Sequence, residues 1–132
     1  MTDSVSKRRP GPDLGGRAVA DPRPAVDGDR IRGARCRACG YPTAPPAPWC
    51  PACHQLDTID AAFGPGGAVW SSTVVHIPVG RWKPPYAIAY VDLDDGPRVL
   101  AHLQHPVVLP PGTRVRVSGR TENGDIVVEE GE

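Results

Sequence analysis

Alternating hydrophobic and polar residues predict a series of β-strands in the second half of the chain. One segment turns Val99, Ala101 and Leu103 to a single face, and residues 113–118 alternate strictly, with two arginines on the polar side. Residues 86–93 are almost continuously apolar, so we expect that strand to be covered on both faces. The five segments with strand-like patterns are residues 68–77, 86–93, 98–104, 113–118 and 126–129.

Turn signals separate these segments. The sequence Asp94-Asp95-Gly96 predicts a tight turn that joins two strands into a hairpin, and residues 122–125 predict another turn before the last strand. Five antiparallel strands in so short a span would expose unpaired edges unless they closed, and the small five-stranded barrel that closes is the OB-fold. No amphipathic helical stretch of useful length is present, so we expect a mostly β protein.

The first half of the chain has a different character. Residues 30–35 form a short predicted strand, and the proline-rich residues 41–48 predict an extended loop. Arginines among Pro, Gly and Ala in the first 25 residues are typical of a disordered segment. We therefore divide the chain into a disordered basic Pro/Gly-rich tail at residues 1–25, a small first domain at 26–62 and an OB-fold at 63–130.

Four cysteines give this first half its chemistry. They form two C-x-x-C pairs separated by ten residues, a spacing that lets four thiolates converge on one metal ion: Cys36, Cys39, Cys50 and Cys53. Gly40 supplies the left-handed backbone that the first turn requires. The metal is predicted to be Zn²⁺, so residues 26–62 are predicted to form a zinc ribbon. Because four protein ligands leave no open position, the role of the metal is predicted to be structural. His54 follows the last cysteine and is read as a surface loop residue.

Paired disulfides or a redox dithiol are the alternatives to zinc. Disulfides would require an oxidising compartment, but no apolar run follows the first basic residues, and no stretch has the length of a membrane span. We expect a cytoplasmic protein without a membrane partner.

These motifs, in this order, resemble a known family. The sequence Cys36-Arg-Ala-Cys-Gly40, then Cys50-Pro-Ala-Cys53, then the segments 67–76, 85–93 and 112–117, is similar to the rubredoxin-like zinc-ribbon/OB-fold proteins associated with acyl-CoA enzymes. The resemblance covers about residues 27–128. It implies a non-catalytic accessory subunit, in lipid or steroid metabolism, that binds a thiolase-superfamily enzyme: a sterol-carrier-type thiolase, an aldolase or an HMG-CoA synthase-like protein. In some members the partner is a hotdog-fold hydratase.

The family resemblance also implies that the barrel helps to position or enclose an acyl-CoA thioester, while the partner supplies the catalytic groups. One segment has suitable chemistry for that contact, because Arg81 and Lys83 place two cations beside the indole of Trp82. This segment is expected to contact CoA or the partner. An ordinary hairpin loop with Trp82 folded onto the barrel is the simpler alternative.

Two other functional classes are weighed against this one. A stand-alone enzyme would have to use His76, His102 or His105, but no serine or cysteine lies in a nucleophile context, so no catalytic residue is assigned. A single-stranded nucleic-acid binder is the main rival, because OB-folds and zinc ribbons recur in that class. From residue 65 onward, however, six Lys or Arg face eight Asp or Glu, a net charge of −2 that disfavours phosphate-backbone binding.

Overall fold

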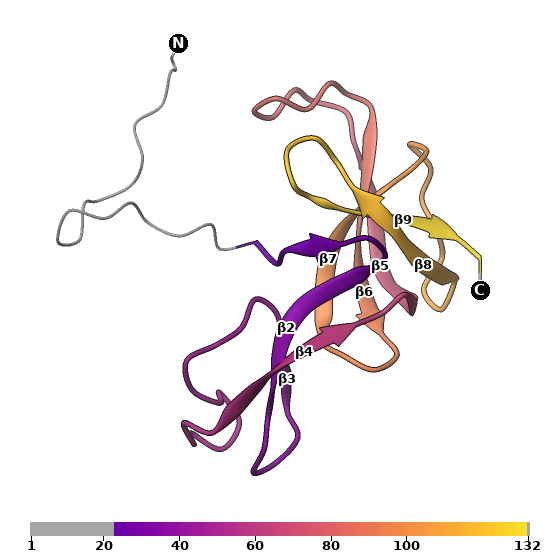
Figure 1. Cartoon of the computed structure of the whole chain (residues 1–132). Coiled ribbons are helices and arrows are strands. Elements are labelled where there is room, and N and C mark those ends of the chain that lie inside the picture. The colour runs from indigo at the N-terminus through magenta and orange to yellow at the C-terminus, as the bar shows by residue number, and fades with distance from the viewer. Residues whose placement is uncertain (1–22, 132) are drawn as a thin grey trace, which may run out of the picture.

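The structure is a computed structural model that describes residues 23–131. The predicted tail at residues 1–25 therefore lies outside the described residues, except for its last three. Within the described part, the chain forms two lobes that contain strands and no helix, as Figure 1 shows. Accordingly, no helix there is long and apolar enough to cross a lipid bilayer.

The first lobe is a small sheet built around one central strand, β2 (Arg30–Cys36). Its antiparallel neighbours are the short strands β1 (Val26–Asp27) and β3 (Pro42–Thr43) on one side and β4 (Thr58–Phe63) on the other. The predicted loop at residues 41–48 thus contributes two residues to the sheet. Strand β4 was not predicted, because Asp60, Ala61 and Ala62 have weak strand preference and the strand depends on pairing with β2.

The second lobe is a closed barrel of five strands, in the order β5-β6-β7-β9-β8. All neighbours pair antiparallel except β7 and β9, which run parallel. The closed barrel removes the unpaired edges that five separate strands would expose, so the predicted OB-fold is confirmed. The strands are β5 (Gly66–Val75), β6 (Tyr86–Leu93), β7 (Arg98–Leu103), β8 (Arg114–Arg120) and β9 (Ile126–Glu130).

Small aliphatic side chains fill the barrel. Val99 and Ala101 of β7 point inward with Val115 and Val117 of β8, as their alternation predicted. Phe63 is the only aromatic residue of this core. The buried cluster consists of Ile31, Phe63, Val69, Ala89, Val91, Leu93, Val99, Ala101, Val115, Val117, Ile126 and Val128.

Strand β6 differs from its prediction. Its side chains alternate between buried and more exposed, and Tyr90 is 47% exposed, so the expectation that this strand is covered on both faces is wrong for the chain alone. The physical reason is closure, because a small barrel has one packed interior and one outer face. Ala87 and Ala89 point inward, whereas the larger Tyr86 and Tyr90 point outward.

The two lobes meet at Phe63, which ends β4 and enters the barrel core. A Cβ atom on Gly96 would lie 2.6 Å from the Phe63 ring, so a larger residue there would displace the ring. The guanidinium of Arg35 donates a 2.6 Å hydrogen bond to the carbonyl of Asp95, and the Asp95 carboxylate accepts one of 2.9 Å from the Gly64 N–H. Sheet and barrel therefore share a core and a hydrogen-bonded junction.

Candidate functional site

The four cysteine sulfurs converge at the far end of the first lobe. All four lie within 4.8 Å of one another, and the Sγ–Sγ distances are 3.6 Å for Cys36–Cys53 and 3.6 Å for Cys39–Cys50. A disulfide requires about 2.05 Å, so these are free thiols. Sulfurs bound to one tetrahedral zinc at 2.3 Å lie about 3.8 Å apart. The spacing of this donor set fits zinc.

Two similar turns present these sulfurs. In the first, the Gly40 N–H donates to the Cys36 carbonyl at 2.8 Å, and in the second the His54 N–H donates to the Cys50 carbonyl at 2.8 Å. Gly40 has φ of +82°, as predicted, and His54 occupies the equivalent left-handed position with φ of +68°. His54 is exposed on the surface, where its ring meets the edge of Trp49.

The proton affinities of two thiols in the cluster are shifted in opposite directions. Burial raises the pKa of Cys50, but backbone N–H groups of Cys53 and Ala52 outweigh it and bring that pKa down to about 7. The Gln55 N–H lowers the pKa of Cys53, yet burial and the neighbouring thiols outweigh it and raise that pKa to about 12. Four thiolates at this spacing repel one another, so a divalent cation is needed to hold all of them deprotonated.

The barrel has a second candidate region on the outer face of β6 and β7. OB-folds bind ligands on their second and third strands, between the loops that join strands one to two and four to five. In this chain those strands are β6 and β7, and the loops are residues 76–85 and 121–125. A cavity of about 420 Å³ lies between the loops and is lined by Arg23, Val79, Gly80, Arg81, Trp82, Asn123 and Asp125.

Trp82 lies against the barrel rather than projecting from it. Its ring stacks on His102 with a centroid distance of 3.9 Å and lies 5.6 Å from the Tyr86 ring. In the chain without a partner, Trp82 is thus folded onto the barrel, as the simpler of the two alternatives predicted. Burial lowers the pKa of His102, although the charge of Asp125 partly opposes this, so the ring is held toward its neutral form.

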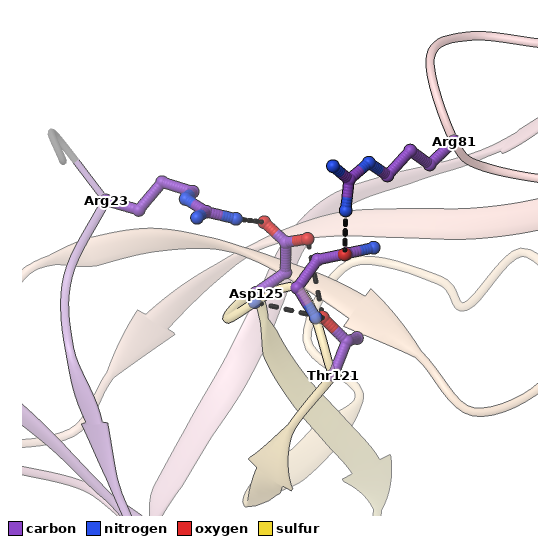
Figure 2. Close-up of polar contacts among 5 residues, drawn as sticks. Arg23, Arg81, Thr121 and Asp125 are labelled. Carbon is purple, nitrogen blue, oxygen red and sulfur yellow. Dashed lines mark hydrogen bonds and ion pairs between the residues drawn. The ribbon is translucent and has the colours of Figure 1, made fainter. Parts of the chain in front are cut away.

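Figure 2 shows polar contacts of Arg23, Arg81, Thr121 and Asp125, three of which line this cavity. Arg81 donates to the Asn123 side-chain oxygen at 3.0 Å, and Arg23 pairs with Asp125 at 2.9 Å. The Thr121 hydroxyl braces the same turn by accepting a 3.0 Å hydrogen bond from the Asp125 N–H. Lys83 is exposed.

Comparison with known families assigns both lobes. A model of the ChsH2 rubredoxin-like zinc ribbon domain matches residues 28–57, and a model of the ChsH2 C-terminal OB-fold domain matches residues 61–120. Together they span more than half of the chain and include all four cysteines. The chain belongs to the ChsH2 zinc-ribbon/OB-fold family. This confirms the family resemblance inferred from the sequence.

Curated relatives match this ChsH2-family chain over part of their length. It is 35% identical over 96 residues to a "Probable enoyl-CoA hydratase alpha subunit" of Thermomonospora curvata, which covers 62% of this chain and 30% of that protein. It is 29% identical over 76 residues to a "DUF35 domain-containing scaffold protein" of Methanothermobacter thermautotrophicus, covering 55% and 57% of the two. The chain thus corresponds to under two thirds of either relative.

A solved structure covers more of the molecule. A chain of the "Ltp2-ChsH2(DUF35) aldolase" superposes with a TM-score of 0.63 and 28% sequence identity. The superposition covers 82% of this ChsH2-family chain and 98% of the other. The two-lobed architecture is therefore shared with a protein that was solved as part of an aldolase.

The structure places beside the cavity several residues that were not predicted to belong to the site. Asn123 and Asp125 lie in a predicted turn but also hold Arg81 and Arg23 beside the cavity. His102 lies twenty positions after Trp82, and only the barrel register places their rings in contact. His76 and His105 are exposed, and His105 lines a different cavity.

Proposed function

We propose that this ChsH2-family chain is a non-catalytic accessory subunit that binds a thiolase-superfamily enzyme and helps to position an acyl-CoA thioester. The observation that carries this proposal is the superposition on nearly the whole of a chain of the Ltp2-ChsH2(DUF35) aldolase. A sterol-carrier-type thiolase, an aldolase or an HMG-CoA synthase-like enzyme is the expected class of partner. The relative named as a hydratase subunit adds hydratases, such as hotdog-fold enzymes, to the partners worth testing.

The metal has a structural role in this proposal. Cys36, Cys39, Cys50 and Cys53 would hold one Zn²⁺ through four thiolates, which leaves no coordination position for water or substrate. The ion supplies cross-linking of the two turns. The cysteines are then unavailable as nucleophiles, so the chemistry on the thioester belongs to the partner.

We place the contact with CoA or the partner at Arg81, Trp82 and Lys83. Arg81 borders the cavity between the two loops, and the adjacent ammonium group of Lys83 is exposed. Guanidinium and ammonium groups suit phosphate oxygens, and an indole suits an adenine ring. Asn123 orients Arg81 from the opposite loop. The chain is expected to act in the cytoplasm, where acyl-CoA thioesters are available.

Co-expression tests this function directly. The chain would be produced with individual thiolase-fold proteins encoded in the same genome, and each pair would be passed over a size-exclusion column. Co-elution as one stoichiometric complex with one zinc per chain is expected. Failure of the chain to co-elute with any thiolase-fold or hydratase protein would contradict the proposal, and salt-sensitive binding to single-stranded DNA or RNA would favour the nucleic-acid alternative.

A second experiment tests the loop. Replacing both Arg81 and Trp82 by Ala should weaken CoA affinity of the complex or its assembly, while the exposed control Leu56→Ala, on the other lobe, should leave CoA affinity unchanged. Unchanged values for the double variant would remove this loop from the proposal without touching the accessory role.

A further inference from the structure

The chain uses its aromatic residues unusually. It has only seven Phe, Trp and Tyr residues. Phe63 alone lies in the core, whereas Trp70, Trp82, Tyr86 and Tyr90 lie on or beside the outer face of β5, β6 and β7. Burial of aromatic side chains is the largest single contribution that a small core can receive. A fold that leaves four of seven on one outer face therefore requires another explanation for them.

Two of these aromatic side chains and one leucine form the centre of that face. Trp70, Tyr90 and Leu100 are 51%, 47% and 50% exposed and come from three adjacent strands. Tyr90 lies opposite Leu100 in the β6–β7 register, and the rings of Trp70 and Tyr90 meet edge to face at 6.0 Å. We call these three residues the outer-face patch, or simply the patch.

The backbone builds this exposure into the fold. The register of β5 against β6 shifts between Val69 and Ser71, so Trp70 occupies a β-bulge. After the inward-facing Val69, both Trp70 and Ser71 are exposed, whereas a regular strand would turn one of them inward. All three residues of the patch therefore lie in hydrogen-bonded strands of the barrel and not in a loop.

The environment of the rings argues against a stacking ligand. The guanidinium carbon of Arg98 lies 3.9 Å from the centre of the Trp70 ring, and His102 covers one face of Trp82 at 3.9 Å. Single-stranded nucleic-acid binders use open ring faces as platforms for successive bases. At both tryptophans one such face is already taken by a side chain of the protein itself. This reduces the ring surface that is open to a base, whereas the ring edges and Leu100 suit the irregular apolar surface of a protein.

Charge at the border of the patch favours an uncharged partner surface. Arg98 donates to both oxygens of Asp92, at 2.6 Å and 3.3 Å, so the cation and the carboxylate nearest the patch neutralise each other. A charged side chain of a partner would therefore find no unpaired opposite charge at the centre of the patch. Three half-exposed large side chains contribute roughly 300 Å², and a stable interface needs about 800 Å² on each side. The patch therefore has the size of the central anchor of a larger interface.

We infer that Trp70, Tyr90 and Leu100 form the anchor by which the barrel docks on an apolar, uncharged surface of the thiolase-superfamily enzyme. This inference rests on the proposed function and adds the surface that performs it. The paired Arg98 and Asp92 lie at its border. Leu100 also lines a second, smaller cavity with His102, and this cavity shares Arg23 and Asp125 with the cavity beside Arg81. Docking there would bring the loop at residues 76–85 to the edge of the same interface.

A lysine substitution at the patch tests this surface. Leu100→Lys should weaken the complex with the thiolase-fold protein at least about tenfold, because a charge would be buried without a partner. The matched control is Val108→Lys, since Val108 is an aliphatic residue of similar exposure, 55%, and lies outside the patch in the loop between β7 and β8. Affinity would be measured by titration of the purified enzyme, with zinc content and circular dichroism as checks on folding.

Hydroxyl-radical footprinting of the unmodified chain gives an independent readout. Oxidation of Trp70, Tyr90 and Leu100 should fall in the complex, while that of Val108 stays unchanged. Equal affinity of both lysine variants, or unprotected patch residues, would overturn this interface and leave the accessory function standing. Protection in the chain alone by self-association, or by oligothymidylate in low salt, would overturn it in favour of another occupant. Failure of the unmodified chain to bind any such enzyme would overturn both proposals.

Discussion

Between residues 36 and 57 of the zinc ribbon only Cys36 and Cys50 are buried, whereas the barrel buries aliphatic side chains from all five of its strands. This segment therefore has a defined backbone path but buries too few apolar side chains to stabilise it. The barrel has a continuous core with no metal ligand. The metal-binding segment and the barrel thus obtain their order from different interactions, a metal in one and hydrophobic burial in the other.

Because of this difference, the side chains that stabilise the chain are not the ones that it offers to a partner. Four thiolates around one ion fix the ribbon, and the barrel core is complete without large aromatic residues. The barrel can therefore place its aromatic residues on the outer face, where they are available to a partner. Phe63 is the exception, because it connects the two lobes from within the core.

Removing the metal should have the largest effect. Zinc contributes apparent free energies of about 10–16 kcal/mol in zinc-finger peptides, so chelation should unfold residues 36–57. The barrel amides should keep their protection, because their core holds no ligand. Hydrogen exchange with mass spectrometry measures both lobes at once, and added zinc should restore the ribbon. Simultaneous loss of barrel protection would contradict this separation of the metal-binding segment from the barrel core.

Truncating the connecting side chain should come next. Phe63→Ala should lower the free energy of unfolding by about 3–5 kcal/mol, because it empties a fully buried site. Phe63→Leu, which retains most of the volume, should cost less than about 2 kcal/mol. Urea unfolding of the zinc-loaded chain gives both values. A loss under about 1 kcal/mol for the alanine variant would show that the lobes do not share a core.

Acid should destabilise the barrel modestly through His102. The folded chain holds the pKa of His102 below its usual 6.5, so the unfolded chain binds a proton first as the pH falls. This contribution to stability is complete above about pH 6.5 and is lost toward the lower folded-state pKa. Replacing His102 with Gln should therefore reduce the fall in unfolding free energy between pH 7.5 and 5.5. An unchanged fall would contradict the assignment.

The exposed ion pair of the barrel should matter least. Arg114 donates to Asp94 at 3.0 Å and lowers the pKa of that carboxyl below its usual 3.8. The stabilisation is present above about pH 4 and disappears as the pH falls through the folded-state pKa. Asp94→Asn should thus change urea stability only slightly at pH 7, and 1 M salt should reduce the difference further. A loss as large as that of Phe63→Ala would contradict the account.

The same division explains what the sequence could predict. Cysteine spacing, strict alternation and continuous apolar runs are local signals, so the metal cluster and the barrel strands were predicted from them, and the apolar run gave the bounds of β6. Strand β4 depends on pairing with β2, and the bulge at Trp70 depends on register, so neither has a clear local signal. The outward face of β6 did have one. Ala87 and Ala89 alternate with Tyr86, Ile88 and Tyr90, and small residues fit a narrow barrel interior.

Reconstituted turnover tests the central claim, that this chain is an accessory subunit and its partner the enzyme. Acyl-CoA conversion would be measured for the co-eluting thiolase-fold protein alone, for this zinc-loaded chain alone, and for the two together. The account predicts full activity only for the combination and none for this chain alone. Turnover by this chain alone, or full activity of the partner in its absence, would contradict the account.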